Sequence, residues 1–118
     1  MSDVHCNLLV IRSSKLERAA SFYEALGLRF TKHRHGSGPE HYAAQSTNQT
    51  FEIYPLAENA PPTTETRIGF AVGEIDHVFQ RLIEVGGKPV STPRPSPWGR
   101  RAVICDPDGH RVELTADA

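Results

Sequence analysis

Residues 13–30, SSKLERAASFYEALGLRF, carry the clearest local pattern in the chain. Glu17 lies three residues after Ser14, which predicts a capping box where a helix begins. Gly27 predicts the end of that helix. Apolar side chains recur between these signals at helical spacing: Leu16, Ala19, Ala20, Tyr23 and Leu26. We therefore expect an amphipathic helix here.

The same order of expected helices and strands occurs twice along the chain. Strand-like runs lie at 4–11, 28–33, 41–45 and 50–54 around the first helix, and at 67–72, 88–92, 101–105 and 111–115 around a second helix expected at 74–85. The helix-end signals Gly27 and Gly86 are 59 residues apart, and this spacing indicates an internal repeat. One half has too little apolar surface to be stable alone, so we expect an α+β fold in which two βαβββ modules share a core.

Length and charge narrow the possible functions. The 118 residues fit a single domain, 1–118, with module one at about 1–56, a linker at 57–66 and module two at about 67–118. Thirteen Lys and Arg against fourteen Asp and Glu leave no surplus of positive charge for nucleic acid. No apolar run approaches the roughly 20 residues of a membrane-spanning helix. We expect neither a nucleic-acid nor a membrane partner.

The N-terminus and the cysteines indicate a cytoplasmic protein. No basic stretch precedes the first short apolar run, so a signal peptide is not expected. Cys6 and Cys105 form no CxxC pair, and both lie in strand-like apolar runs. We expect two buried free thiols, with a structural disulfide as the alternative.

Strand alternation predicts which side chains face away from the helices. In FEIY that face carries Glu52 and Tyr54, and in RVEL it carries Glu113. In TRIGFAV it carries Arg67. The first strand is less regular: Leu8 and Val10 are expected toward the helix, which leaves Asn7, Leu9 and Ile11 on the other side.

Equivalent places in the two halves thus hold Asn7, Glu52, Arg67 and Glu113, and pseudo-twofold symmetry is expected to bring them together. Two carboxylates that converge in a cavity repel each other, so both stay ionised only beside a cation. That cation is either a bound metal or Arg67.

These segments, with the FYxxLGL helix end and the DPDGxxxEL ending as the most specific parts, resemble the vicinal oxygen chelate superfamily. That superfamily includes glyoxalase I, the fosfomycin- and bleomycin-resistance proteins and extradiol dioxygenases. The resemblance covers nearly the whole chain. It implies two βαβββ modules that form a curved, cupped mixed sheet with helices on the outer face. It also implies functional sites that are completed through a dimer or a tandem copy, and we expect a homodimer.

The resemblance further implies a divalent metal (Zn, Ni, Mn or Fe) held by the first and fourth strands of each module. Glu52 and Glu113 match the fourth-strand positions, whereas Asn7, or a neighbour, and Arg67 occupy the other two. A guanidinium cannot ligate a metal, because it stays protonated. We therefore expect either an arginine–carboxylate cluster in place of the metal, or a metal on the two glutamates with His5 as a further ligand.

Several other side chains are candidates for ligand contact. His33, His35 and His41 surround a glycine-containing loop, and His41 is the best placed because it begins a strand. Tyr54 and Trp98 offer flat apolar walls, although core packing is an alternative for Trp98. Arg101 is expected either to bind an anionic ligand or to pair with Glu113 across strands.

Three further polar features, His77, His110 and the DPDG segment, indicate no functional role. His77 and His110 are expected to be solvated. The DPDG segment is expected to be a turn without a part in catalysis.

Two functions remain open. The first is a metal-free dimer that binds a small organic molecule, as the bleomycin-resistance branch does, and Arg67 favours it. The second is a metal-dependent lyase, isomerase or dioxygenase acting on a small oxygen-rich substrate, with Glu52 or Glu113 as ligand or catalytic base.

Overall fold

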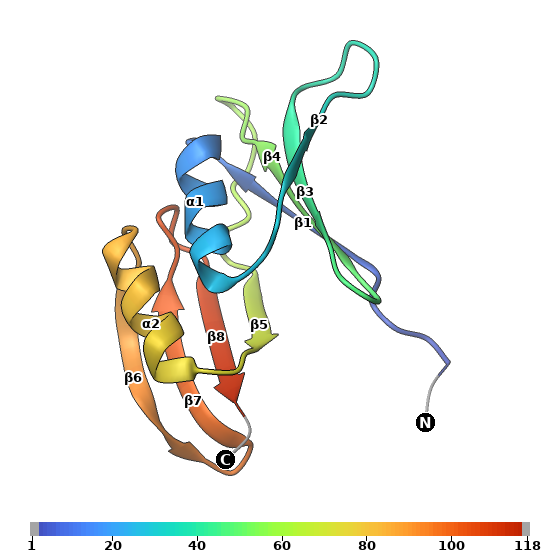
Figure 1. Ribbon diagram of the computed structural model, residues 1–118. Coiled ribbons are helices and arrows are strands. Elements are labelled where there is room, and N and C mark those ends of the chain that lie inside the picture. Colours follow the sequence, from blue (N-terminus) through green and yellow to red (C-terminus); the bar gives the residue numbers. More distant parts are fainter. Residues whose placement is uncertain (1–2, 117–118) are drawn as a thin grey trace.

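The computed structural model describes residues 3–116, and it confirms the α+β class and the repeated order of elements (Figure 1). Each half begins with a strand, continues through one helix and ends with three strands. In chain order the elements are β1 (Leu8–Ser13), α1 (Leu16–Leu26), β2 (Thr31–His33), β3 (His41–Gln45), β4 (Thr50–Pro55), β5 (Arg67–Ala71), α2 (Ile75–Glu84), β6 (Lys88–Ser96), β7 (Gly99–Cys105) and β8 (Arg111–Ala116).

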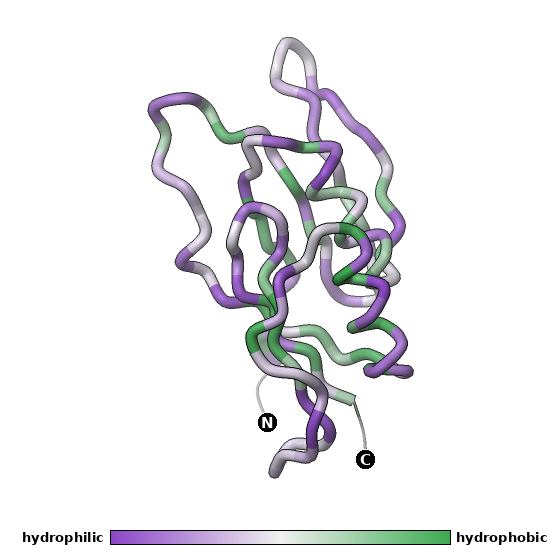
Figure 2. The backbone as a smooth tube through the Cα atoms, turned by 90° about the vertical axis from the view of Figure 1, so that its left-hand side faces the viewer, coloured by the Kyte–Doolittle hydropathy of each residue, from purple (hydrophilic) through white to green (hydrophobic). Residues whose placement is uncertain are grey.

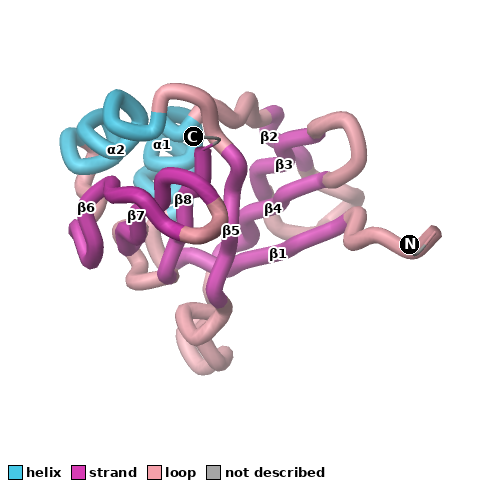
Figure 3. Tube along the Cα trace, turned by 90° about the horizontal axis from the view of Figure 1, so that it is seen from below, coloured by secondary structure: helices cyan, strands magenta, loops and turns pink. Residues whose placement is uncertain are grey.

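The strands form two four-stranded mixed sheets with the same topology. Their orders are β1-β4-β3-β2 and β5-β8-β7-β6. In both sheets the first strand of the module pairs in parallel with its last strand, and the other neighbours are antiparallel. The parallel pair is possible because a helical crossover separates its two strands. The repeat in the sequence is therefore a repeat in structure (Figure 3).

Both helices lie on the same side of the molecule and contact each other (Figure 1). A single hydrophobic cluster spans the two modules. The Tyr23 ring of α1 lies 4.8 Å from Phe51 of β4, and Phe51 lies 5.8 Å from Phe70 of β5. Figure 2 shows the hydrophobic stretches gathered where the helices and strands meet. Phe70 thus joins the core of module two to that of module one.

The start of α1 differs from the expected capping box. Neither serine caps the helix in that way: the Ser13 hydroxyl accepts a hydrogen bond from the Lys15 amide at 3.0 Å. The Glu17 carboxylate instead accepts a hydrogen bond from the Tyr42 hydroxyl of β3 at 2.8 Å. The Glu17 side chain, which the capping-box motif predicted to bind the start of the helix, therefore makes a tertiary contact with β3 instead. The end of the helix at Gly27 is confirmed, with a φ of 127°.

The orientation of β1 is the reverse of the expected one. Ile11 is completely buried in the core, whereas Leu8 and Arg12 are exposed. The run LLVI is apolar at every position, so alternation within it does not indicate which face is inside. Arg12, the hydrophilic residue after this run, indicates the outer face, because it shares that face with Leu8 and Val10.

Strand β6 is longer than predicted and continues to Ser96 through three prolines. It lies at the edge of its sheet and pairs only with β7, with register shifts between Pro89 and Ser91 and between Ser91 and Arg94. Proline is tolerated at such an edge because its missing N–H would face solvent.

The cysteines are free, but the expected burial is wrong. Cys6 is exposed and Cys105 is half-buried. Among the described residues, neither helix has the length and apolar character that crossing a membrane requires.

Candidate functional site

A transverse row of cationic and aromatic side chains crosses all four strands of the first sheet. Arg12 on β1 is the register partner of Tyr54 on β4, and His33 on β2 is that of His41 on β3. The Tyr54 and His41 rings stack at 4.1 Å with 7° between their planes. The Arg12 guanidinium lies 5.4 Å from the centre of the Tyr54 ring. Two predicted ligand contacts, His41 and Tyr54, are therefore direct neighbours.

His41 has an unsatisfied ring nitrogen. The side chain is 1% exposed, and Nδ1 lies 3.4 Å from the carbonyl oxygen of Pro39. Nε2 is buried with no hydrogen-bond partner, and it lies 3.7 Å from Oε2 of Glu52. That separation is too long for a hydrogen bond. A buried polar atom without a partner is costly, so this nitrogen marks a place where a further group can bind.

Glu52 lies in the next row of the same face, and its neighbours are apolar. Its register partners are Val10 on β1 and Ala43 on β3. Asn7 precedes β1 and, with His5, lines a shallow hollow beside the turn between β3 and β4.

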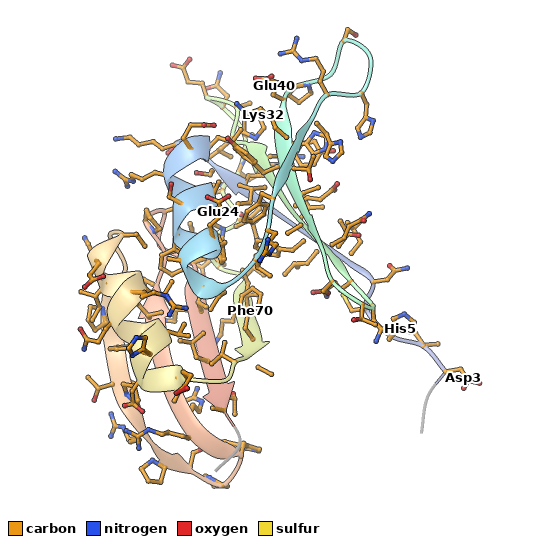
Figure 4. The ribbon with its side chains drawn as sticks, in the orientation of Figure 1. Asp3, His5, Glu24, Lys32, Glu40 and Phe70 are labelled. Carbon is orange, nitrogen blue, oxygen red and sulfur yellow. The ribbon has the colours of Figure 1, made fainter. Side chains whose placement is uncertain are left out.

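The structure therefore does not bring Asn7 beside Glu52. Figure 4 shows His5 near the N-terminal end of the described chain, far from Lys32 and Glu40 on the hairpin of β2 and β3.

Glu113 is the centre of an ion-pair cluster on the second sheet. Its Oε1 accepts a hydrogen bond from Arg101 at 2.8 Å, and its Oε2 accepts one from Arg67. The hydrogen bond from Arg101 is the leading cause of a pKa of Glu113 below its ordinary value, and Arg67 contributes to it. The expected pairing of Arg101 with Glu113 is confirmed. Gly69, the residue directly beside Glu113 on β5, has no side chain to contribute.

The predicted residues thus fall into two separate sets. One set on the first sheet comprises Glu52, His41 and Tyr54, and the other on the second sheet comprises Arg67, Arg101 and Glu113. Within residues 3–116, no described ion pair, hydrogen bond or hollow joins the two sets. Trp98 belongs to neither set: it lies at the turn between β6 and β7 and is 72% exposed, so core packing is wrong for it.

A buried polar network around Asp106 was missed by the sequence reasoning. Oδ2 of Asp106 accepts hydrogen bonds from the Tyr23 hydroxyl at 2.7 Å and from Nδ1 of His110 at 2.9 Å. Nε2 of His110 lies 2.7 Å from the Thr63 hydroxyl, which accepts a hydrogen bond from the Arg12 amide. His110 is completely buried, so its expected solvation is wrong.

This network holds the turn between β7 and β8 and does not form a metal site. Asp106, Asp108 and His110 present ligand atoms within 4.8 Å of one another. However, Oδ1 of Asp106 already accepts the amides of residues 108, 109 and 110, and Oδ2 accepts two side-chain donors. Its lone pairs are therefore occupied. The DPDG signal for a turn was present in the sequence, but nothing in it pointed to a buried histidine partner.

Three hollows bear on ligand binding. The largest of them, about 600 Å³, lies between the end of α1 and the start of α2 and contains none of the predicted site residues. One of about 480 Å³ is lined by Arg67 and Arg111 of the second sheet. One of about 320 Å³ lies against β2 and β3 beside His33.

The sequence matches the Glyoxalase/Bleomycin resistance protein/Dioxygenase superfamily over residues 4–114. The chain belongs to this superfamily. Its fold is similar to TnmS3, an antibiotic binding protein from Streptomyces sp. CB03234, at a TM-score of 0.77 and 24% identity, with 100% of this chain and 99% of that chain covered. None of the curated proteins matches the sequence.

Two further solved structures share the fold. Hypothetical protein SA1046 from S. aureus has a TM-score of 0.76 at 23% identity, with 98% of this chain and 95% of that chain covered. A glyoxalase-related enzyme from Fulvimarina pelagi also has a TM-score of 0.76, at 20% identity, with 94% of this chain and 86% of that chain covered. At these identities the likeness concerns the fold.

The side chains at the first- and fourth-strand positions do not fit the divalent metal that the superfamily often binds. At the fourth-strand positions Glu52 and Glu113 offer carboxylates, but the residue beside Glu52 on β1 is Val10. Both oxygens of Glu113 accept hydrogen bonds from arginines, which carry the positive charge that a metal would supply. A valine and a guanidinium supply no lone pair to a cation.

Proposed function

We propose that this protein binds a small organic molecule without the metal centre of its enzymatic relatives. The observation that carries the proposal is the engagement of Glu113 by Arg67 and Arg101. A carboxylate that already neutralises two guanidinium groups is a poor ligand for a further cation, because binding one would place three cations around a single carboxylate. The half-buried Tyr54 ring, which stacks on the buried His41 ring, supplies a flat surface against which an organic molecule can pack.

The comparisons support this class of function. TnmS3 is described as an antibiotic binding protein, and its chain is covered almost completely by this fold. We infer a comparable binding role here, with the chemistry of the ligand set by the side chains of this chain. We also propose a cytoplasmic location with neither nucleic acid nor membrane as partner, consistent with the near-balanced charge of the chain.

We further propose that the working form is a homodimer. The two sets of site residues lie on different sheets, and both sheets expose the face that points away from the helices. A second copy can place its first sheet opposite the second sheet of its partner, which would enclose both sets in one cavity. Sedimentation velocity should give a dimer at micromolar concentration, and a monomer that persists at high concentration would overturn this arrangement.

A metal titration tests the proposed absence of a metal. Metal-stripped protein is titrated with Zn²⁺, Ni²⁺, Mn²⁺ and Fe²⁺ by calorimetry, and the elements in the untreated protein are measured in parallel. We expect no stoichiometric binding by the wild-type protein. A gain of binding in Arg67→His would support the view that the arginine replaces the metal. Stoichiometric wild-type binding that Glu52→Ala abolishes would contradict it.

The second candidate is a metal-dependent lyase, isomerase or dioxygenase acting on a small oxygen-rich substrate. It is favoured by the unpartnered Nε2 of His41, which lies 3.7 Å from Glu52 Oε2. An imidazole nitrogen and a carboxylate are ordinary ligands of divalent transition metals. In the same titration, this candidate predicts binding that His41→Asn and Glu52→Ala both abolish, while Arg67→Gln leaves it unchanged.

A further inference from the structure

The face of the second sheet that points away from the helices is strongly basic. Arg100 shows which way the strands face: it lies on the side of the helices and pairs with Asp76 of α2 at 2.8 Å. Its neighbour Arg101 therefore faces outward, as its contact with Glu113 confirms. By register, the outward positions hold five basic side chains against one carboxylate: Arg67, Lys88, Arg94, Arg101 and Arg111 against Glu113.

Like charges stand directly opposite each other on this face. Arg67 on β5 is the register partner of Arg111 on β8, and Arg94 on β6 is that of Arg101 on β7. Directly opposed like charges destabilise a sheet. Glu113 offsets only part of the repulsion, because its two oxygens contact Arg67 and Arg101. Arg111 is exposed, and no carboxylate within residues 3–116 forms a described ion pair with it.

A hollow lies at the end of this face where Arg67 and Arg111 are paired. It has a volume of about 480 Å³ and lies between Arg67 and Arg111, with Thr64 and the Gly109 backbone on its wall. Glu65 and Asp108 also line it, so within the hollow two guanidinium groups face two carboxylates, and the positive excess lies on the adjoining sheet face. The volume lies within the range of sites for small organic ligands.

We infer that the outward face of β5-β8-β7-β6 binds the anionic part of an organic ligand, a carboxylate, phosphate or sulfonate. The inference rests on the proposed small-molecule function and names the chemical class of its ligand. Arg67, Arg101 and Arg111 supply planar donors that suit a bidentate anion. The excess is confined to one face of a chain whose net charge is −1, which favours a small anion over a nucleic acid.

A matched pair of fluorescent probes tests the inference. Anilinonaphthalene sulfonate carries one sulfonate, and phenylnaphthylamine is its neutral counterpart. We expect the wild-type protein to bind the sulfonate at least about tenfold more tightly than the neutral probe, and to lose about that factor in Arg111→Gln or Arg101→Gln. Arg34→Gln, which removes an exposed arginine from the loop between β2 and β3, serves as the matched control and should bind both probes as the wild type does.

The outcomes separate the two proposals. Equal binding of both probes, or sulfonate binding that the arginine variants leave unchanged, would overturn the anion site but leave small-molecule binding in place. Binding of neither probe would overturn both. An altered sedimentation coefficient in the arginine variants, with unchanged sulfonate binding, would make this face a dimer contact and overturn the anion site.

Thermal melting provides a control for folding. Arg111→Gln should melt no lower than the wild type, because it removes the charge that opposes Arg67. Pyrophosphate, compared with chloride at equal ionic strength, should raise the melting temperature of the wild type more than that of Arg111→Gln. An equal rise in both proteins would overturn the anion site.

Discussion

The Asp106 carboxylate is the polar group on which the turn between β7 and β8 depends. It is almost completely buried, and it accepts hydrogen bonds from three backbone amides, Tyr23 and His110. Tyr23 belongs to module one and Asp106 to module two, so the hydrogen bond between them also links the modules. Burial alone would raise the pKa of Asp106, but the hydrogen bonds from His110 and Tyr23 outweigh it and hold that pKa below its ordinary value.

Asp106→Asn should lower the free energy of unfolding by about 2–4 kcal/mol, as measured by urea denaturation. An amide that keeps its oxygen toward the backbone donors presents its NH₂ group to two further donors, so the buried hydroxyl of Tyr23 loses its acceptor. Asp108→Asn is the matched control, because its amide oxygen can still accept from Ser13. Equal losses in the two variants would show that the buried network adds no stability of its own.

The depressed pKa of Asp106 also predicts a pH dependence. A carboxyl group with a lower pKa in the folded than in the unfolded state contributes stability above its unfolded pKa of about 4. That contribution is lost as the pH falls through the lower, folded pKa. Urea unfolding from pH 7 to pH 3 should therefore show a smaller decline for Asp106→Asn than for the wild type. Parallel curves would contradict the assigned pKa direction.

The end of α2 depends on a glycine for close packing. A Cβ atom at Gly87 would lie 2.7 Å from the carbonyl oxygen of Leu82, 2.7 Å from Ile104 Cδ1 and 2.9 Å from Phe22 Cε1. Gly87→Ala should therefore lower the free energy of unfolding by about 1–3 kcal/mol, because the backbone carbonyl cannot move aside. Gly73→Ala is the control, since nothing lies within 4 Å of its Cβ. Equal melting temperatures for the two variants would contradict this packing.

Elements were predictable from the sequence where periodicity and end signals agreed. The helix that ends at Gly27 formed as expected because its apolar side chains recur at helical spacing. The hairpin of β3 and β4 formed as expected because a polar turn joins two strand-like runs. The face of β1 was not predictable, since LLVI is apolar throughout. The length of β6 was hidden by its prolines, which only an edge strand tolerates.

The candidate site was predictable one module at a time. Alternation placed Glu52 with Tyr54 and Glu113 with Arg67 on outward faces, and the structure agrees. How the two sheets are oriented depends on contacts between distant segments, such as that of Phe70 with Phe51. No local pattern encodes such contacts, so the convergence of the four predicted residues could not be judged from the sequence.

At the scale of the whole chain, the shared core predicts one cooperative unfolding transition. Tyrosine fluorescence, which comes from Tyr23, Tyr42 and Tyr54, reports on module one, and Trp98 fluorescence reports on module two. Thermal curves from the two signals should coincide. Phe70→Ala should lower the free energy of unfolding by about 2–4 kcal/mol, because the Phe70 ring packs against Tyr23 and Phe51. Two separate wild-type transitions would show that each module folds on its own.

We propose that arginine takes the place of a metal beside Glu113. Anomalous diffraction from crystals grown with excess Zn²⁺ or Mn²⁺ tests it most directly. We expect Arg67 and Arg101 to remain on the Glu113 carboxylate, with no anomalous peak within about 2.5 Å of its oxygens. A peak on Glu113, with Arg67 displaced from the carboxylate, would contradict it.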